Sequence, residues 1–73
     1  MKEHERVVLT CDLDEYGLLT GDVGTVVHVH EDAAAYEVEF MTLTGQTLAV
    51  VTLRAAQIRA IAQREIPHAR VVA

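Results

Sequence analysis

The sequence has little of what usually holds a very small domain together. One cysteine among 73 residues excludes a disulfide within the chain, and no spacing of metal ligands replaces one. A domain of this length buries only about 60–65% of the surface that its unfolded chain exposes, so a single copy is marginally stable. Because 51% of the residues are hydrophobic, we expect some apolar surface to be buried against another subunit.

Basic residues are also scarce. Six Lys and Arg face eleven Asp and Glu, for a formal net charge of −5, which argues against binding to nucleic acid or anionic membranes. The charge is unevenly placed: residues 1–40 hold ten acids and two bases, whereas residues 41–73 hold four bases and one acid. Either the two parts complement each other within one body, or the basic C-terminal part docks on the acidic face of a neighbouring copy.

Signals for export and membrane insertion are missing. No window approaches the roughly 18 apolar residues that a membrane helix needs. Residues 1–6 are charged where a signal peptide would be apolar. A lone cysteine fits a reducing compartment. These features predict a cytoplasmic protein that does not bind a membrane.

No pattern points to catalysis. The chain has no glycine-rich phosphate loop and no Ser/His/Asp or Cys/His arrangement of familiar spacing. Asp12, Asp14 and Glu15 cluster, but such a run is typical of a solvated loop. Cys11 precedes Asp12, and an adjacent carboxylate disfavours a reactive thiolate. The sequence therefore predicts neither an enzyme nor a cofactor.

What the sequence does contain is a tight turn that leads into a strand. Two glycines flank an Asp-Val pair at Gly21–Gly24, and a β-branched run follows at once. Glycine adopts positive φ without steric cost, and aspartate bonds readily to nearby backbone. The segment therefore predicts a turn followed by a strand at residues 25–30.

A hairpin follows this strand. Residues 31–34 predict its turn, and residues 36–40 alternate strictly between apolar and polar, which predicts its second strand. Closing the turn with four residues fixes the register. The predicted pairs on the core face are Val29–Tyr36, Val27–Val38 and Thr25–Phe40. The predicted pairs on the opposite face are His28–Glu37 and Val26–Glu39.

Further strands are predicted on either side of this hairpin. Residues 7–11 are rich in β-branched residues and predict the first strand. A loop at residues 12–19 follows it, and we expect this loop to tuck Leu13 and either Leu18 or Leu19 beneath it.

The strand predicted at residues 46–53 follows a turn at 42–45 and is apolar on both faces. One face is expected to meet the core, and the other to meet either the C-terminal segment or a second subunit. Residues 55–57 then predict one helical turn before a closing strand at 58–61, with a helix over 54–62 as the alternative.

Together these elements predict an all-β fold. We expect a small five-stranded SH3-like barrel over residues 1–61, with one short helical turn before the last strand. Residues 62–73 form a C-terminal tail, which an adjoining subunit could order.

The order and spacing of the predicted strands carry a family resemblance. The segments concerned are Val8–Thr10, Leu18–Val27, Tyr36–Phe40 and Thr47–Leu53. Over residues 7–61 the chain resembles a bacterial family catalogued as domain of unknown function 4926. The resemblance implies the barrel fold and no catalytic residue. Small chains of this kind also occur among mobile gene-cassette proteins.

The turn at Gly21–Gly24 and the strand after it are also similar to the KOW element of RNA-binding barrels. This resemblance implies a nucleic-acid-binding barrel as the alternative function. Basic residues usually surround that element, whereas acidic residues surround it here. Nucleic acid is therefore disfavoured as a partner.

Two histidines give the one candidate for metal chemistry. His28 and His30 share a face of their strand, and His28 is expected opposite Glu37. Two imidazoles and a carboxylate bind zinc or nickel, but ordinary cross-strand pairing explains the same residues without a third ligand at fixed spacing. Metal binding at these three residues is the less favoured interpretation, and no metal site is predicted.

The main prediction is a protein-interaction module that self-associates and has no catalytic activity. It depends on the small size, on the strand that is apolar on two faces, and on the split in charge. The candidate interaction residues are Tyr16, Leu48, Val50, Arg54 and Arg59.

Overall fold

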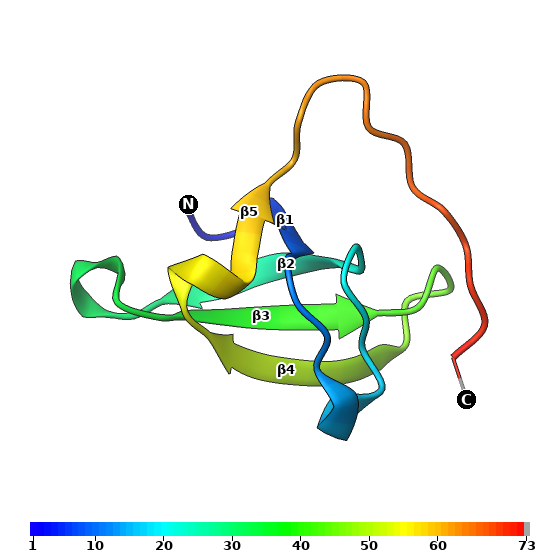
Figure 1. Cartoon of the computed structure of the whole chain (residues 1–73). Helices are drawn as coiled ribbons and strands as arrows, with labels where there is room; N and C mark the ends of the chain where they lie inside the picture. The colour runs from blue at the N-terminus through cyan, green and yellow to red at the C-terminus, as the bar shows by residue number, and fades with distance from the viewer. Residues whose placement is uncertain (73) are drawn as a thin grey trace.

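The computed structural model describes residues 1–72, whose five strands form one antiparallel sheet (Figure 1). The strands are β1 (Arg6–Leu9), β2 (Val23–Val29), β3 (Tyr36–Met41), β4 (Thr47–Leu53) and β5 (Ile58–Ala60). Short 3-10 turns lie between them: η1 (Asp14–Tyr16), η2 (Glu31–Ala33) and η3 (Ala55–Gln57). The strand order is β4-β3-β2-β1-β5, and no pairing joins β4 to β5 within the described residues. The sheet is therefore open, with β4 and β5 as its edges.

The predicted all-β architecture with five antiparallel strands is confirmed, and no strand end differs from its predicted place by more than two residues. The helical turn before the last strand is confirmed as η3, so the alternative helix over 54–62 is wrong. Pairing with β1 decides the outcome, because it places Ile58 opposite Leu9 and buries both side chains. An amphipathic helix would have left the edge of β1 without a partner.

The core lies on one face of the curled sheet. Within β3, Tyr36, Val38 and Phe40 point into it, as their alternation predicted. The loop before β2 closes it: Leu18 is buried and Leu13 packs against the cluster, whereas Leu19 is exposed. The buried cluster consists of Val7, Leu9, Leu18, Val26, Tyr36, Val38, Phe40, Val51, Leu53 and Ile58.

The register of the β2–β3 hairpin is correct at one end only. The pairs Val29–Tyr36 and His28–Glu37 are confirmed. The pairs Val27–Val38, Thr25–Phe40 and Val26–Glu39 are wrong: Val26 pairs with Val38 and Thr25 with Glu39, because a β-bulge lies between Val26 and His28.

The bulge exchanges two valines between the core and the surface. Val26 is fully buried, whereas Val27 is 37% exposed and does not join the interior that was predicted for it. Val29 is half-buried and packs against the core. An extra residue in one strand shifts the alternation that follows it, and two adjacent valines carry no sequence signal of which one is extra.

Gly24 has a structural role other than turn formation. Gly21 has the positive φ of 95° that the turn needs, but Gly24 is an ordinary strand residue. A Cβ atom on Gly24 would lie 2.5 Å from Cγ1 of Val38 and 2.8 Å from Cε1 of Phe40. The absence of a side chain therefore lets β2 approach the core side chains of β3.

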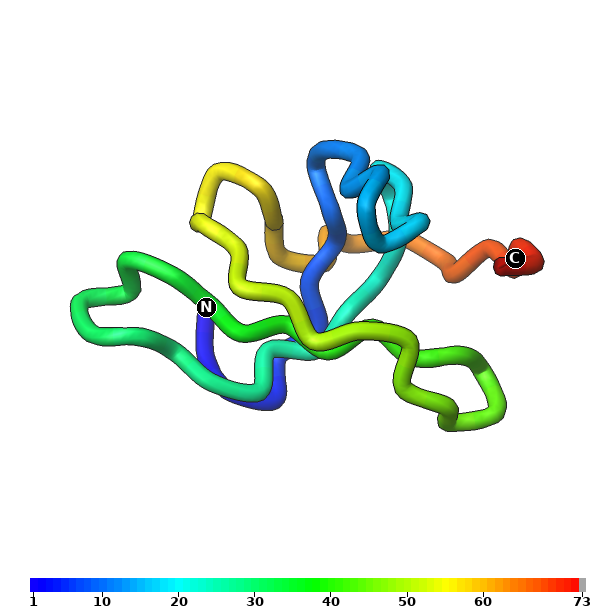
Figure 2. The backbone as a smooth tube through the Cα atoms, turned by 90° about the horizontal axis from the view of Figure 1, so that it is seen from below, coloured from blue at the N-terminus to red at the C-terminus, as the bar shows by residue number. Residues whose placement is uncertain are grey.

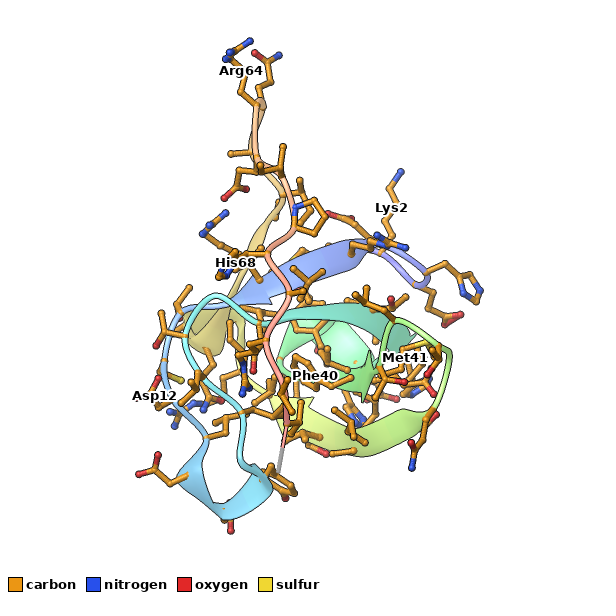
Figure 3. All side chains as sticks on the ribbon, turned by 90° about the vertical axis from the view of Figure 1, so that its right-hand side faces the viewer. Lys2, Asp12, Phe40, Met41, Arg64 and His68 are labelled. Carbon is orange, nitrogen blue, oxygen red and sulfur yellow. The ribbon has the colours of Figure 1, made fainter. Side chains whose placement is uncertain are left out.

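The chain after β5 leaves the sheet and returns to it as an arch. In Figure 1 this tail, in orange and red, descends at the end of the molecule that carries the β3–β4 turn. Figure 2 shows that the β2–β3 and β3–β4 turns project from opposite ends of the sheet. In Figure 3, Arg64 lies at the tip of the arch and His68 on its return. Residues 61–72 contain no helix or strand.

Candidate interaction surface

The edge strand β4 is apolar on both faces, of which the inner face is buried and the outer face is exposed. Val51 and Leu53 on the inner face are buried in the core. On the outer face, Leu48 is 39% and Val50 is 52% exposed. The side of β4 away from β3 pairs with no strand within residues 1–72. The predicted two-faced strand therefore exists, and its second face and free edge are uncovered within the described part of the chain.

Acidic side chains of β3 lie beside this edge and are held by its threonines. The Thr52 hydroxyl donates to Oε2 of Glu37 at 2.7 Å, and the Thr47 hydroxyl donates to Oε2 of Glu39 at 2.5 Å. Val50 is the cross-strand partner of Glu39 and lies between these two bonds. The two carboxylates are thus hydrogen-bonded on the outer face, and Val50 is the apolar residue of β4 between them.

Glu37 also links β3 to β2. Its Oε2 lies 2.6 Å from Nε2 of His30, whose ring packs edge-on against His28 with centroids 5.0 Å apart. The hydrogen bond with His30, followed by that from Thr52, lowers the pKa of the Glu37 carboxyl. No group of three or more His, Cys, Asp or Glu in residues 1–72 is placed to hold a metal ion. The arrangement is that of a cross-strand polar cluster.

A groove separates the outer face of the sheet from the tail. Val8 and Val23 line it on the sheet, and Ile66 and Val72 line it on the tail. Leu48 lies along the same groove, so it extends to the exposed edge strand.

The tail is tied to the body at Arg70. Its Nε donates to Oδ1 of Asp22 at 2.9 Å, and its Nη2 contacts Oδ2 of Asp22 and the carbonyl oxygen of Gly17, the latter at 3.2 Å. Asp22 also accepts a hydrogen bond from the Leu19 amide at 2.8 Å. Partial burial acts to raise the pKa of Asp22, but the bonds from Arg70 and Leu19 outweigh it, so the pKa is lowered.

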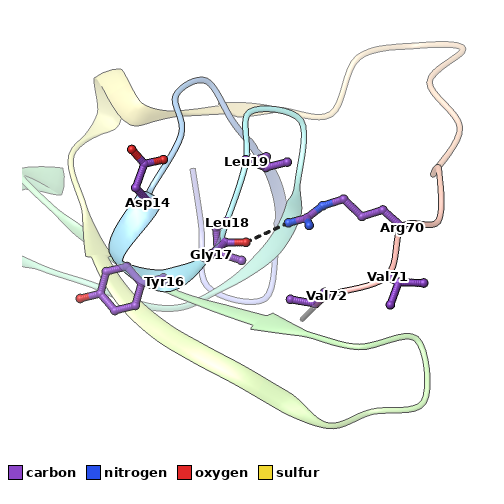
Figure 4. Close-up of a pocket in the computed structure, with 8 residues that line it drawn as sticks. All are labelled: Asp14, Tyr16, Gly17, Leu18, Leu19, Arg70, Val71 and Val72. Carbon is purple, nitrogen blue, oxygen red and sulfur yellow. Dashed lines mark hydrogen bonds between the residues drawn. The ribbon is translucent and has the colours of Figure 1, made fainter.

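A small pocket of about 350 Å³ adjoins this tie. Tyr16, Gly17 and Leu19 line it on the loop before β2, and Arg70 and Val72 line it on the tail (Figure 4). The Tyr16 ring is exposed at its rim. The tail thus forms one wall of a pocket that Tyr16 also lines.

The two predicted arginines lie at different places. Arg54 directly follows β4; its amide donates to Oε1 of Gln57 at 2.9 Å, and its side chain is exposed. Arg59 on β5 forms a bidentate pair with Glu65, with distances of 2.9 and 2.7 Å. That pair, with the Ala62 amide, lowers the pKa of Glu65 to about 2.

The predicted interaction residues therefore do not form one patch. Leu48 and Arg59 line the same groove, Val50 adjoins Leu48 on β4, and Tyr16 and Arg54 lie outside that groove. Sequence reasoning missed Asp22 and Arg70 as individual residues. The split in charge along the chain was the available signal, because this pair joins the acidic part to the basic part.

Comparison with known proteins gives one match. A family model described as a domain of unknown function, DUF4926, matches residues 3–60, which is most of the chain. This match confirms the predicted resemblance. No curated protein and no solved structure matches the sequence. None of the helical turns in residues 1–72 has the length and apolar character that a membrane crossing requires.

Proposed function

The chain belongs to the DUF4926 family, whose description names no activity, and we propose that it is a protein-interaction module that self-associates through β4. The observation that carries this proposal is the exposed apolar face of an unpaired edge strand, at Leu48 and Val50. The module performs no chemistry in this proposal, and its partner is a second copy of the chain.

The composition of β4 supports pairing with another strand. Proteins commonly protect an edge strand with charged residues, proline or bulges, because its free N–H and C=O groups accept a further strand. The segment TLAVVTL contains no charge and no proline. A register shift next to Met41 disturbs only the start of β4, so residues 49–53 form a regular edge.

A twofold pairing fits this edge well. Antiparallel association of two β4 strands about Val50 would place Val50 beside its own copy and Leu48 opposite Thr52 of the second chain. The two sheets then continue across the interface. Burial of the valine and leucine side chains contributes about 25 cal/mol for each Å² of apolar surface removed from water.

We also propose that the sheet is a small SH3-like barrel. Three features support this fold: the strand order, the loop before β2 that closes the core with Leu18, and the helical turn between β4 and β5. In this proposal the sheet curls around the buried cluster as an open barrel, and β4 is one of its two margins.

Light scattering coupled to size-exclusion chromatography tests self-association. We expect the mass to rise from one chain to two between low and high micromolar concentration. Val50→Glu places a charge on the exposed edge and should leave a monomer. Val27→Glu is the matched control, because Val27 is similarly exposed but lies on the interior strand β2.

Circular dichroism of both variants shows whether the fold is intact. A wild-type chain that stays monomeric at every concentration contradicts the proposal. So does equal self-association of the wild type and the folded Val50→Glu variant.

A further inference from the structure

The tail is attached to the body by two side-chain contacts, the Arg59–Glu65 pair near its start and the bonds of Arg70 near its end. Within the described chain, residues 61–72 form no backbone–backbone hydrogen bond with the sheet or its loops. The Ala62 amide bonds only within the tail, to Glu65. Beyond the local Arg59–Glu65 pair, the polar contacts to the body come from Arg70 alone. The nine residues between β5 and Arg70 form an arch whose one polar contact with a strand is the Arg59–Glu65 pair (Figures 1 and 3).

The tail leaves two of its apolar side chains almost wholly in water. Ile66 is 87% exposed and Val71 is 95% exposed. The groove beneath them is open and has apolar residues of the sheet, Val8 and Val23, along its floor. Docking within one chain thus satisfies the charge of Arg70 but leaves Ile66 and Val71 in water, although Val8 on the groove floor is already buried.

We propose that two copies exchange their tails, so that Arg70 of one chain binds Asp22 and the Gly17 carbonyl of the other. This inference rests on the proposed self-association and adds a second contact to it. Exchange keeps the same pair of charges and the same hydrogen bonds, since the element and its receptor are identical in both copies. The site on each body is then completed by a residue from its partner.

Docking within one chain and exchange between two chains differ in energy only through the arch. The Arg70–Asp22 bonds are equal in both, so the difference lies in residues 61–69 and in the apolar side chains they carry. An exchanged tail crosses from one body to the other and can lay Ile66 and Val71 against the groove of the second copy. Pairing at β4 brings that groove near, because Leu48 lies along it, and so raises the effective concentration of the tail.

The charge pattern suits a second copy as well as it suits the chain's own tail. The receptor carboxylate belongs to the acidic part of the chain, residues 1–40, and the tail to the basic part. A neighbouring copy presents the same complementary pair twice in a twofold dimer.

Charge reversal separates exchange from docking within one chain. Asp22→Arg and Arg70→Asp are made as two single variants. Each variant alone carries like charges at positions 22 and 70. It therefore cannot form the ion pair, either within one chain or between two copies of itself. In an equimolar mixture, both pairs are restored between unlike chains and never within a chain. We expect the mixture to form a heterodimer with a dissociation constant about tenfold lower than that of either variant alone.

A crosslinking experiment gives an independent measurement that keeps the Arg70–Asp22 pair. Leu19→Cys and Val71→Cys are placed together in a chain with Cys11→Ser, because both positions line the pocket beside Arg70 (Figure 4). A short bismaleimide should join them between chains and give a covalent product of twice the mass. It is informative even where a charge-reversed variant fails to fold.

The outcomes distinguish the two proposals. If the wild type is monomeric throughout, self-association and exchange both fail. If the wild type self-associates and Val50→Glu disrupts it, but crosslinks form only within chains, exchange alone is overturned. A charge-reversed mixture that behaves as the average of its folded components overturns exchange in the same way.

Discussion

At the scale of single residues, the clearest constraint is the missing side chain of Gly24. Gly24→Ala should destabilise the fold by about 1–3 kcal/mol, because its methyl group would overlap Val38 and Phe40 in the packed core. Urea unfolding followed by circular dichroism measures this change. Gly45→Ala is the control: its Cβ would contact nothing within 4 Å, so its cost reflects the positive φ of 93° alone. An unchanged stability for Gly24→Ala would contradict the close approach of β2 and β3.

Asp22 should make stability depend on acid. Its pKa is lower in the folded protein than its ordinary value of 3.8, so the charged form is stabilised by folding. That contribution is fully present above pH 3.8 and is lost as the pH falls through the lowered folded pKa. Asp22→Asn should therefore cost about 0.2–1 kcal/mol at neutral pH and almost nothing in strong acid.

Unfolding in urea across this pH range measures the difference between wild type and variant. Asp14→Asn, an exposed carboxyl of the same loop, serves as the control. A deficit of Asp22→Asn that stays constant down to strong acid would show that the charge on Asp22 is not what stabilises the fold.

At the scale of elements, the bulge in β2 determines which valine supports the core. Val26→Thr should cost about 1–3 kcal/mol, because it buries a hydroxyl without a partner. Val27→Thr should change stability by no more than about 0.5 kcal/mol, because Val27 faces solvent. The two substitutions are chemically identical and adjacent, so thermal unfolding compares them directly. The reverse order would restore the regular register in which Val27 faces the core.

This element also shows how far sequence reasoning reaches. Alternation located β3 and the inward side chains of Tyr36, Val38 and Phe40, because residues of one strand must share a face. It could not locate the bulge, since either adjacent valine satisfies the hydrophobic pattern. The exposed face of β4 was predictable because its pattern was not ambiguous. The strand is apolar on both faces, and the core of one chain can bury only one of them.

The tie between the tail and the body was not predictable to the residue. Asp22 and Arg70 lie 48 residues apart, and surface charges have many possible partners of similar energy. Composition indicated that the acidic and basic parts attract each other. Which arginine meets which carboxylate depends on the loop at residues 17–22, which brings the backbone carbonyl of Gly17 and the side-chain carboxylate of Asp22 together.

At the scale of the whole molecule, the fold leaves apolar surface uncovered at two places that adjoin. The outer face of β4 carries Leu48 and Val50, and the groove that reaches Leu48 ends beneath an arch that carries Ile66. A chain of 73 residues without a disulfide has a small core to offset the entropy of folding. Association would therefore add stability where a single copy has little.

The melting temperature should consequently depend on protein concentration. When the native state contains two chains and the unfolded state one, a tenfold increase in concentration stabilises the dimer by about 1.4 kcal/mol, or about 0.7 kcal/mol per chain. For a domain of this size, 1 kcal/mol corresponds to about 4–8 °C, so the midpoint should rise by about 3–6 °C. Differential scanning fluorimetry with an extrinsic dye measures it. The melting temperature of Val50→Glu should not depend on concentration. A wild-type melting temperature that is equally independent of concentration would contradict self-association.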